Sequence, residues 1–213
     1  MHLDHLSYAA APQGLVETTA RLGGQLGEEF CDGGVHPRFG TRNMVLPLAD
    51  GRYVEVVTVL DHPASDKMPF GQAVRARSLA GGGWLGWVVA VEDIATVEDR
   101  LGRTAVQGNR YRPDGVDLRW KQVGILGSPD FQQPPFAVQW EVAPEQHPSA
   151  AATGQVRLEA VEIAGDPALL AEWLGEPAVA ALEAVSVQWV APHAAAALVA
   201  AHFSTPHGHV RLI

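Results

Sequence analysis

Two side chains within the first sixty residues could take part in acid–base or metal chemistry. Glu55 stands between two valines in an apolar segment, where a buried carboxylate without a partner costs several kcal/mol. A metal-ligand role, a general-base role with a raised pKa, or a salt bridge to Arg42 would each offset that cost. His5 shares a strand face with Ser7, where a lone histidine is more often a hydrogen-bonded core residue than a ligand. Both residues are candidates for chemistry, and both have a structural alternative.

Polar and aromatic side chains elsewhere could contact a ligand. Arg42 and Asn43 are neighbours in a predicted strand, so at most one of them points towards the ligand. We favour Arg42, because its planar fork of donors suits an anionic or carbonyl group. His36 and His147 each precede a proline in a predicted loop, where functional and solvated histidines are both common. The ligand-contacting set that we expect is Arg42, Asn43, Trp87, Trp120 and His36, with the tryptophans as core or cavity lining.

A recurring pattern would position these residues. An apolar strand, a short helix and a Leu-Gly pair at the helix end occur in residues 3–23, 85–102 and 158–175. Glycine directly after the last apolar residue of a helix is the expected stop, because glycine takes a left-handed cap without steric cost. The chain is therefore predicted to contain three related units.

The first unit spans residues 1–60, and its Asp-Gly turn at residues 50–51 joins two predicted strands in a hairpin. A connector rich in proline and glycine, with a short helix at residues 70–79, covers residues 61–83. The second unit covers residues 84–142 and follows the plan of the first. The third covers residues 155–213, where residues 197–203 are read as a strand, although the alanine-rich run around them could form a helix.

Composition limits the function. The chain has 213 residues and 47% hydrophobic residues, enough for a sizeable core. A formal net charge of -9 with scattered basic residues works against binding nucleic acid. The single cysteine, Cys31, cannot form an internal disulfide, which fits a reducing compartment. No apolar run approaches the roughly 18 residues of a membrane span, and no signal-peptide pattern precedes the first strand. We expect a cytoplasmic protein that binds neither nucleic acid nor a membrane.

The order of these units resembles the strand–helix–three-strand module of the vicinal oxygen chelate superfamily. The resemblance is to the glyoxalase-like branch of that superfamily, which includes proteins of the glyoxalase, bleomycin resistance and extradiol dioxygenase types. The residues that support it are 36–43, 53–57, 112–120 and 135–141, followed by His147-Pro148. It implies an α+β fold in which the first two modules pair within residues 1–150 to form a cup-shaped curled sheet. The third module would follow at the C-terminus.

The resemblance also implies where a divalent metal would bind, because that superfamily places its ligands on the first and last strands of each module. His5 and Glu55 are suitable donors for zinc, iron, nickel or manganese. In the second module Trp87 aligns with His5 and cannot ligate, whereas Gln139 aligns with Glu55 and offers a weak amide oxygen. The implied metal ligands are therefore His5, Glu55 and Gln139, with Glu55 as the catalytic residue.

Three functions remain open at this stage. The chain could be a metal-dependent lyase, isomerase or dioxygenase that acts on a small oxygenated molecule. It could instead be a metal-free protein that binds or sequesters such a molecule, or a scaffold whose cup is filled by its own side chains. An odd number of modules leaves one without a partner, so we expect the third to pack beside the cup or to meet its copy in a homodimer.

Overall fold

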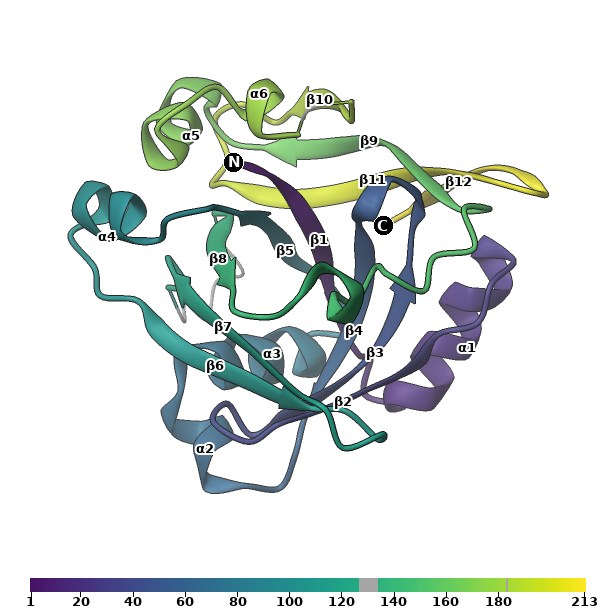
Figure 1. The fold of residues 1–213 in the computed structure, drawn as a ribbon. Helices are drawn as coiled ribbons and strands as arrows, with labels where there is room; N and C mark the ends of the chain where they lie inside the picture. The colour runs from purple at the N-terminus through teal and green to yellow at the C-terminus, as the bar shows by residue number, and fades with distance from the viewer. Residues whose placement is uncertain (127–133, 183) are drawn as a thin grey trace.

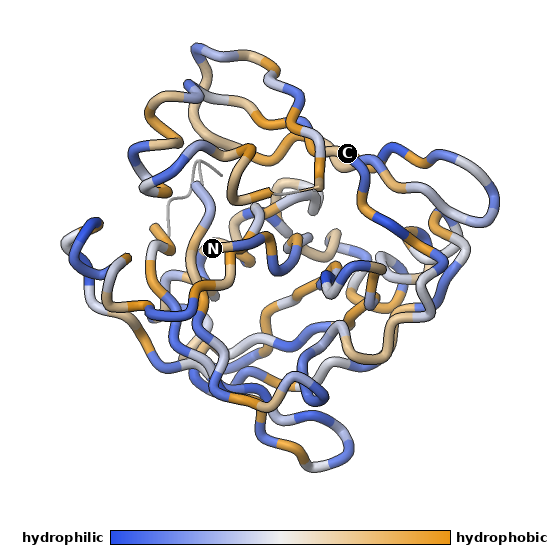
Figure 2. Tube along the Cα trace, turned by 45° about the horizontal axis from the view of Figure 1, so that its top comes forward, coloured by the Kyte–Doolittle hydropathy of each residue, from blue (hydrophilic) through white to orange (hydrophobic). Residues whose placement is uncertain are grey.

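The computed structural model describes residues 1–126, 134–182 and 184–213 (Figure 1). Eight strands form one closed sheet, in the order β1-β4-β3-β2-β6-β7-β8-β5, and four more form a second sheet beside it. The fold is therefore of mixed α+β class, as predicted. Figure 2 shows hydrophobic and hydrophilic stretches interspersed along the described parts of the chain.

The first half of the closed sheet contains a strand, a helix and three strands. These elements are β1 (His2–Ala9), α1 (Leu15–Leu26), β2 (Cys31–His36), β3 (Thr41–Pro47) and β4 (Tyr53–Val59). β4 pairs with β1 in parallel and with β3 in antiparallel, and a short turn around Asp50 joins β3 to β4 as the hairpin pattern predicted. α1 continues past the predicted Leu22-Gly23 stop and ends at a left-handed Gly27 instead.

The second half repeats this order of elements. It comprises β5 (Gly83–Ala90), α4 (Ala95–Leu101), β6 (Val106–Tyr111), β7 (Asp117–Val123) and β8 (Phe136–Trp140). The connector holds two helices, α2 (Pro63–Lys67) and α3 (Pro69–Leu79), of which the sequence predicted the second. The sequence did not predict β2, and it predicted only the end of β6, because neither segment has a run of apolar residues.

The two halves join at two seams. β1 and β5 pair along their length in antiparallel, whereas β2 and β6 meet at a single residue pair, Val35 with Tyr111. The second seam closes the sheet, so the curled sheet that was expected from the resemblance forms a complete ring of strands. Gly34 permits this seam: its φ is 114°, and a Cβ at this position would overlap the carbonyl oxygen of Tyr111.

Replacing Gly34 with alanine is expected to destabilise the protein by more than about 2 kcal/mol, because β2 and β6 must separate and the backbone is strained. Gly24→Ala is the matched control. Gly24 lies in α1 with nothing within 4 Å of an added Cβ, so alanine there should stabilise the helix by about 0.5–1 kcal/mol. Urea unfolding of both variants measures the difference, and an equal effect of the two substitutions would contradict this account of the seam.

The C-terminal unit forms the second sheet. It contains β9 (Arg157–Ala164), α5 (Pro167–Leu174), α6 (Ala178–Leu182), β10 (Ser186–Val190), β11 (Ala197–Thr205) and β12 (Gly208–Leu212). The strand reading of β11 is confirmed, and β11 pairs with β12 as predicted. The strand order is β10-β9-β11-β12, so the first strand of this unit, β9, pairs with its second and third strands. In the first half of the closed sheet, the first strand, β1, pairs with the last strand of that half, β4. The third unit thus has the expected element types in a different strand order, because the strand that pairs in parallel with its first strand is the next one along the chain and not the last.

This second sheet packs against the outside of the β1–β5 seam, which confirms one of the two arrangements expected for the third unit. The Trp84 Nε1 donates to the Leu212 carbonyl at 3.2 Å, and side chains of both sheets share one apolar core. Homodimer formation stays a prediction. None of the helices in the described ranges is both long enough and apolar enough to cross a membrane.

Candidate functional site

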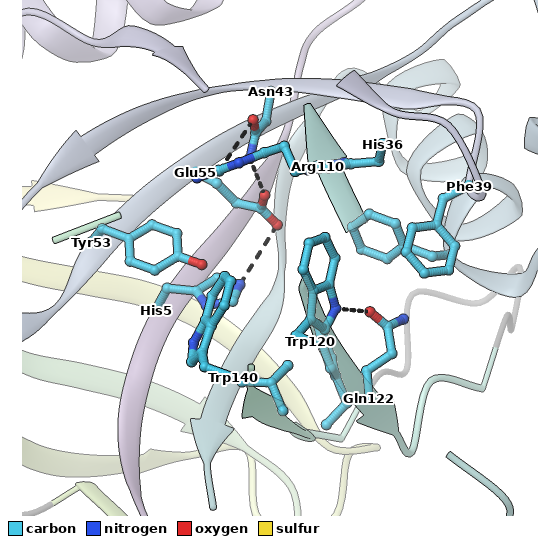
Figure 3. A pocket seen from close by; sticks show the side chains of 13 residues that line it. His5, His36, Phe39, Asn43, Tyr53, Glu55, Arg110, Trp120, Gln122 and Trp140 are labelled. Carbon is cyan, nitrogen blue, oxygen red and sulfur yellow. Dashed lines mark hydrogen bonds and ion pairs between the residues drawn. The ribbon is translucent and has the colours of Figure 1, made fainter. Parts of the chain in front are cut away.

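The closed sheet encloses a cavity of about 30 Å³ with a polar side and an aromatic side (Figure 3). Such a volume holds roughly one or two water molecules. The residues that line it come from both halves of the sheet and from α3. They are His5, His36, Phe39, Asn43, Tyr53, Glu55, Phe70, Arg110, Trp120, Gln122, Phe136, Val138 and Trp140.

Glu55 lies at the polar side with three partners. Because β1 and β4 run in parallel with Ser7 beside Glu55, the Ser7 hydroxyl donates to Oε1 at 2.5 Å. The Asn43 amide donates to Oε2 at 2.7 Å, and the His5 Nε2 lies 3.7 Å from Oε1, an ion-pair distance. Burial alone would raise the pKa of Glu55, but the ion pair with His5 and the Ser7 hydrogen bond lower it to about 2. The carboxylate is therefore charged, in contrast to the raised pKa considered from the sequence.

His5 is oriented by a second buried carboxylate, Asp4. The His5 Nδ1 lies 2.6 Å from the Asp4 Oδ2, and the other Asp4 oxygen accepts from the Trp140 Nε1 at 3.0 Å and lies 3.1 Å from the His147 Nε2. Burial would lower the pKa of His5, but its interactions with Asp4 and Glu55 raise it to about 9. His5 is thus an imidazolium at neutral pH. His147, expected in a loop, belongs to this network and not to solvent.

Arg110 is the charged residue of the cavity lining that the sequence did not predict. It is 4% exposed, and burial lowers its pKa although the charges of Tyr53 and Glu55 oppose this. Within the described residues, its only side-chain hydrogen bond is a long one of 3.5 Å from Nη1 to the Asn43 Oδ1, and its Nε has no partner. Alternation along β6 places Val106, Gly108 and Arg110 on one face, but this strand was not predicted over residues 106–109.

Two more of the predicted ligand contacts, His36 and Trp120, line the cavity. His36 lies at the end of β2, hydrogen-bonded to Thr41, and burial together with the charges of Arg110 and His5 lowers its pKa to about 4 against the opposing charge of Glu55. His36 is thus neutral. Trp120 lies edge-on to His36 and donates to the Gln122 side chain at 2.6 Å. A Cβ at Gly108 would overlap the Trp120 indole, so glycine there lets the ring lie across β6.

Three predicted residues lie outside the cavity. Arg42 is on the outer side of β3 and pairs with Asp32 at 2.8 Å, so Asn43 is the one of the two that points inward. Trp87 is buried between the two sheets, because an irregularity in the β1–β5 pairing between Leu3 and His5 puts Val88 beside His5. Gln139 also points away, and its Oε1 accepts from the backbone N–H of Ile94 at 3.1 Å.

The donor set of the cavity does not fit a tightly held divalent metal. In the second half of the sheet, the strand register puts Val88 and Val138 at the positions that correspond to His5 and Glu55. Valine offers no donor atom, and Gln139 faces elsewhere. No group of three His, Cys, Asp or Glu side chains is placed to hold a metal in the part of the chain that the structure describes. Two protein donors rarely hold a transition metal tightly.

Comparisons with known proteins found one family match and several similar solved structures. A glyoxalase-like domain model matches residues 3–178. No curated protein matches the chain. A hypothetical protein from Staphylococcus aureus has a similar structure, with a TM-score of 0.64 and 18% identity over 82% of this chain and 75% of that chain. Streptomyces coelicolor methylmalonyl-CoA epimerase in complex with 2-nitronate-propionyl-CoA gives a TM-score of 0.43 and 16% identity over 67% and 96% of the two chains. A mutant of 4-hydroxymandelate synthase from Streptomyces coelicolor gives a TM-score of 0.42 and 14% identity, over 70% of this chain and 52% of that chain.

The paired strand–helix–three-strand halves, the cavity between them and the family match define a protein of the vicinal oxygen chelate superfamily. Within it, the chain belongs to the glyoxalase-like domain family, as the resemblance predicted.

Proposed function

We propose that this protein binds a compact organic anion in its cavity and that binding needs no metal. The observation that carries the proposal is Arg110, a buried guanidinium that faces the cavity with an Nε that has no partner among the described residues. Leaving a buried charged donor unsatisfied is costly, and a carboxylate or enolate oxygen would satisfy it with a charge-assisted hydrogen bond.

The rest of the lining supports an amphipathic ligand. Phe39, Phe70 and Phe136 form an aromatic wall, and the polar groups gather at the side of Asn43 and Glu55. Pockets for organic molecules commonly combine an apolar lining with a few polar groups that fix orientation. The ligand would place its oxygen anion beside Arg110 and its apolar part against the rings.

The state of Glu55 favours binding over proton abstraction. A carboxylate with a pKa of about 2 is a weak proton acceptor, whereas an efficient general base has a pKa near the working pH. Its oxygens are already engaged by Ser7 and Asn43. Glu55 would therefore act mainly as the counter-charge that holds His5 and Asn43 in place.

Titration of the purified protein with butyrate and with butyramide tests the proposal. The two probes have similar size and differ in charge, so butyrate should quench the fluorescence of Trp120 and Trp140 at a concentration at least tenfold lower. Equal affinity for acid and amide, or binding of neither, would overturn the proposal.

A metal-dependent lyase, isomerase or dioxygenase is the second candidate, because His5 and Glu55 both face the cavity. Metal analysis of protein purified without a histidine tag separates the two candidates, with Glu55→Gln as the control. We expect less than about 0.1 equivalent of zinc, iron, nickel or manganese in either protein, as two donors bind weakly. One equivalent in the parent protein that disappears in the variant would favour the enzyme.

A further inference from the structure

A second cavity, of about 90 Å³, adjoins the first on the side away from Glu55. Phe39, Phe70 and Gln122 line both cavities, so the two meet at these side chains. The walls of the second cavity are mainly apolar, and polar groups occur where Arg103 and Thr104 stand in the exposed turn before β6. Three of its side chains also pack against the same aromatic cluster as the first cavity, namely Met68, Val106 and Ile125.

The two cavities follow the inner face of β6 and β7. Arg110, Gly108 and Val106 alternate along that face of β6, and the register pairs Gly108 with Trp120 and Val106 with Gln122. Arg110 lines the first cavity and Val106 the second, with the Trp120 indole lying across the strand between them. A buried cation and an apolar slot therefore lie along one face of β6, and the side chains of Phe39, Phe70 and Gln122 stand between the two cavities.

From this arrangement we infer that the second cavity holds the aliphatic tail of the ligand, so that the natural ligand is an acid with an unbranched chain. This inference rests on the proposed function and specifies its ligand. Arg110 meets the carboxylate, the rings of Phe39 and Phe70 flank the first carbons, and Val106 contacts the end of the tail. The four residue-to-residue steps from Arg110 to Val106 span about 13 Å along the strand. Roughly ten carbon atoms with bonds of about 1.5 Å cover that length.

The test is a series of straight-chain acids from acetate to dodecanoate, measured by calorimetry at concentrations below micelle formation. Each added methylene that enters an apolar slot should raise the affinity about three- to fourfold. The gain should continue to octanoate or decanoate and then level off. The corresponding alcohols should bind at least tenfold more weakly at every length, because they lack the charge that Arg110 requires.

Val106→Phe fills the second cavity and therefore tests the inference more directly than the series of acids does. It should leave the affinities for acetate and butyrate unchanged and should lower the affinity for octanoate at least 30-fold. Gln107→Phe, on the opposite and exposed face of β6, is the matched control and should change nothing. Met68→Phe fills the slot from the side of α2 and α3 and should reproduce the loss, which covers the case in which the first variant misfolds.

The outcomes separate the two claims. If short acids bind better than their amides but affinity does not rise with chain length, or if Val106→Phe and Met68→Phe bind octanoate as the parent does, this inference is wrong and the proposed function stands. If no acid of any length binds, both are wrong.

Discussion

Arg110→Met is expected to lower the affinity for butyrate at least 30-fold, which corresponds to about 2 kcal/mol. Methionine keeps an apolar stem of similar reach but removes the guanidinium that would pair with the ligand. The unfolding free energy should not fall, because the variant also removes a buried donor that has no partner within the described residues. Tryptophan fluorescence titration and urea unfolding provide the two measurements.

Arg42→Met is the control for that experiment. Arg42 is the residue favoured from the sequence, but its side chain is 39% exposed and pairs with Asp32 outside the cavity. Its loss should change butyrate affinity less than twofold. A large effect of Arg42→Met with none of Arg110→Met would refute the placement of the anion in the cavity.

Glu55→Gln is expected to lower the unfolding free energy by about 3 kcal/mol, because it leaves the buried His5 imidazolium without one of its two carboxylates. The amide still accepts from Ser7 or Asn43, so the loss reports mainly the missing charge. Glu29→Gln, at an exposed position, should have no measurable effect. Urea unfolding at pH 6 provides the comparison, and a loss below about 1 kcal/mol would argue against the ion pair.

The pH dependence of stability gives an independent check of this network. The pKa of His5 is about 9 in the folded protein and 6.5 ordinarily, so its stabilisation is complete below pH 6.5 and is lost as the pH rises through 9. A shift of this size corresponds to about 3 kcal/mol. In Glu55→Gln the decline between pH 6 and 9 should be smaller, since a weaker partner set raises the pKa of His5 less. Equal declines in both proteins would show that Glu55 does not hold the proton on His5.

Local patterns in the sequence were sufficient for the family, the order of most elements and several residues that line the cavity. Glu55 stood out because a carboxylate between valines in a strand needs a partner, and the structure supplies three. Alternation correctly limited Arg42 and Asn43 to one inward residue. Glycine predicted the ends of α4 and α5, where Gly102 and Gly175 take left-handed conformations. These features depend on neighbours along the chain.

Only the tertiary structure decided which side chains meet in the cavity. A shift of one residue in strand register exchanges the two faces of a strand, so the irregularity in β1 placed Val88 beside His5 and sent Trp87 to the outer core. The choice of Asn43 over Arg42 likewise depended on which face of β3 the ring encloses. Arg110 contacts Asn43 across 67 residues of chain, because the seam between β2 and β6 brings the two halves together. Such a pairing depends on how the sheet closes, and no local pattern of residues encodes it.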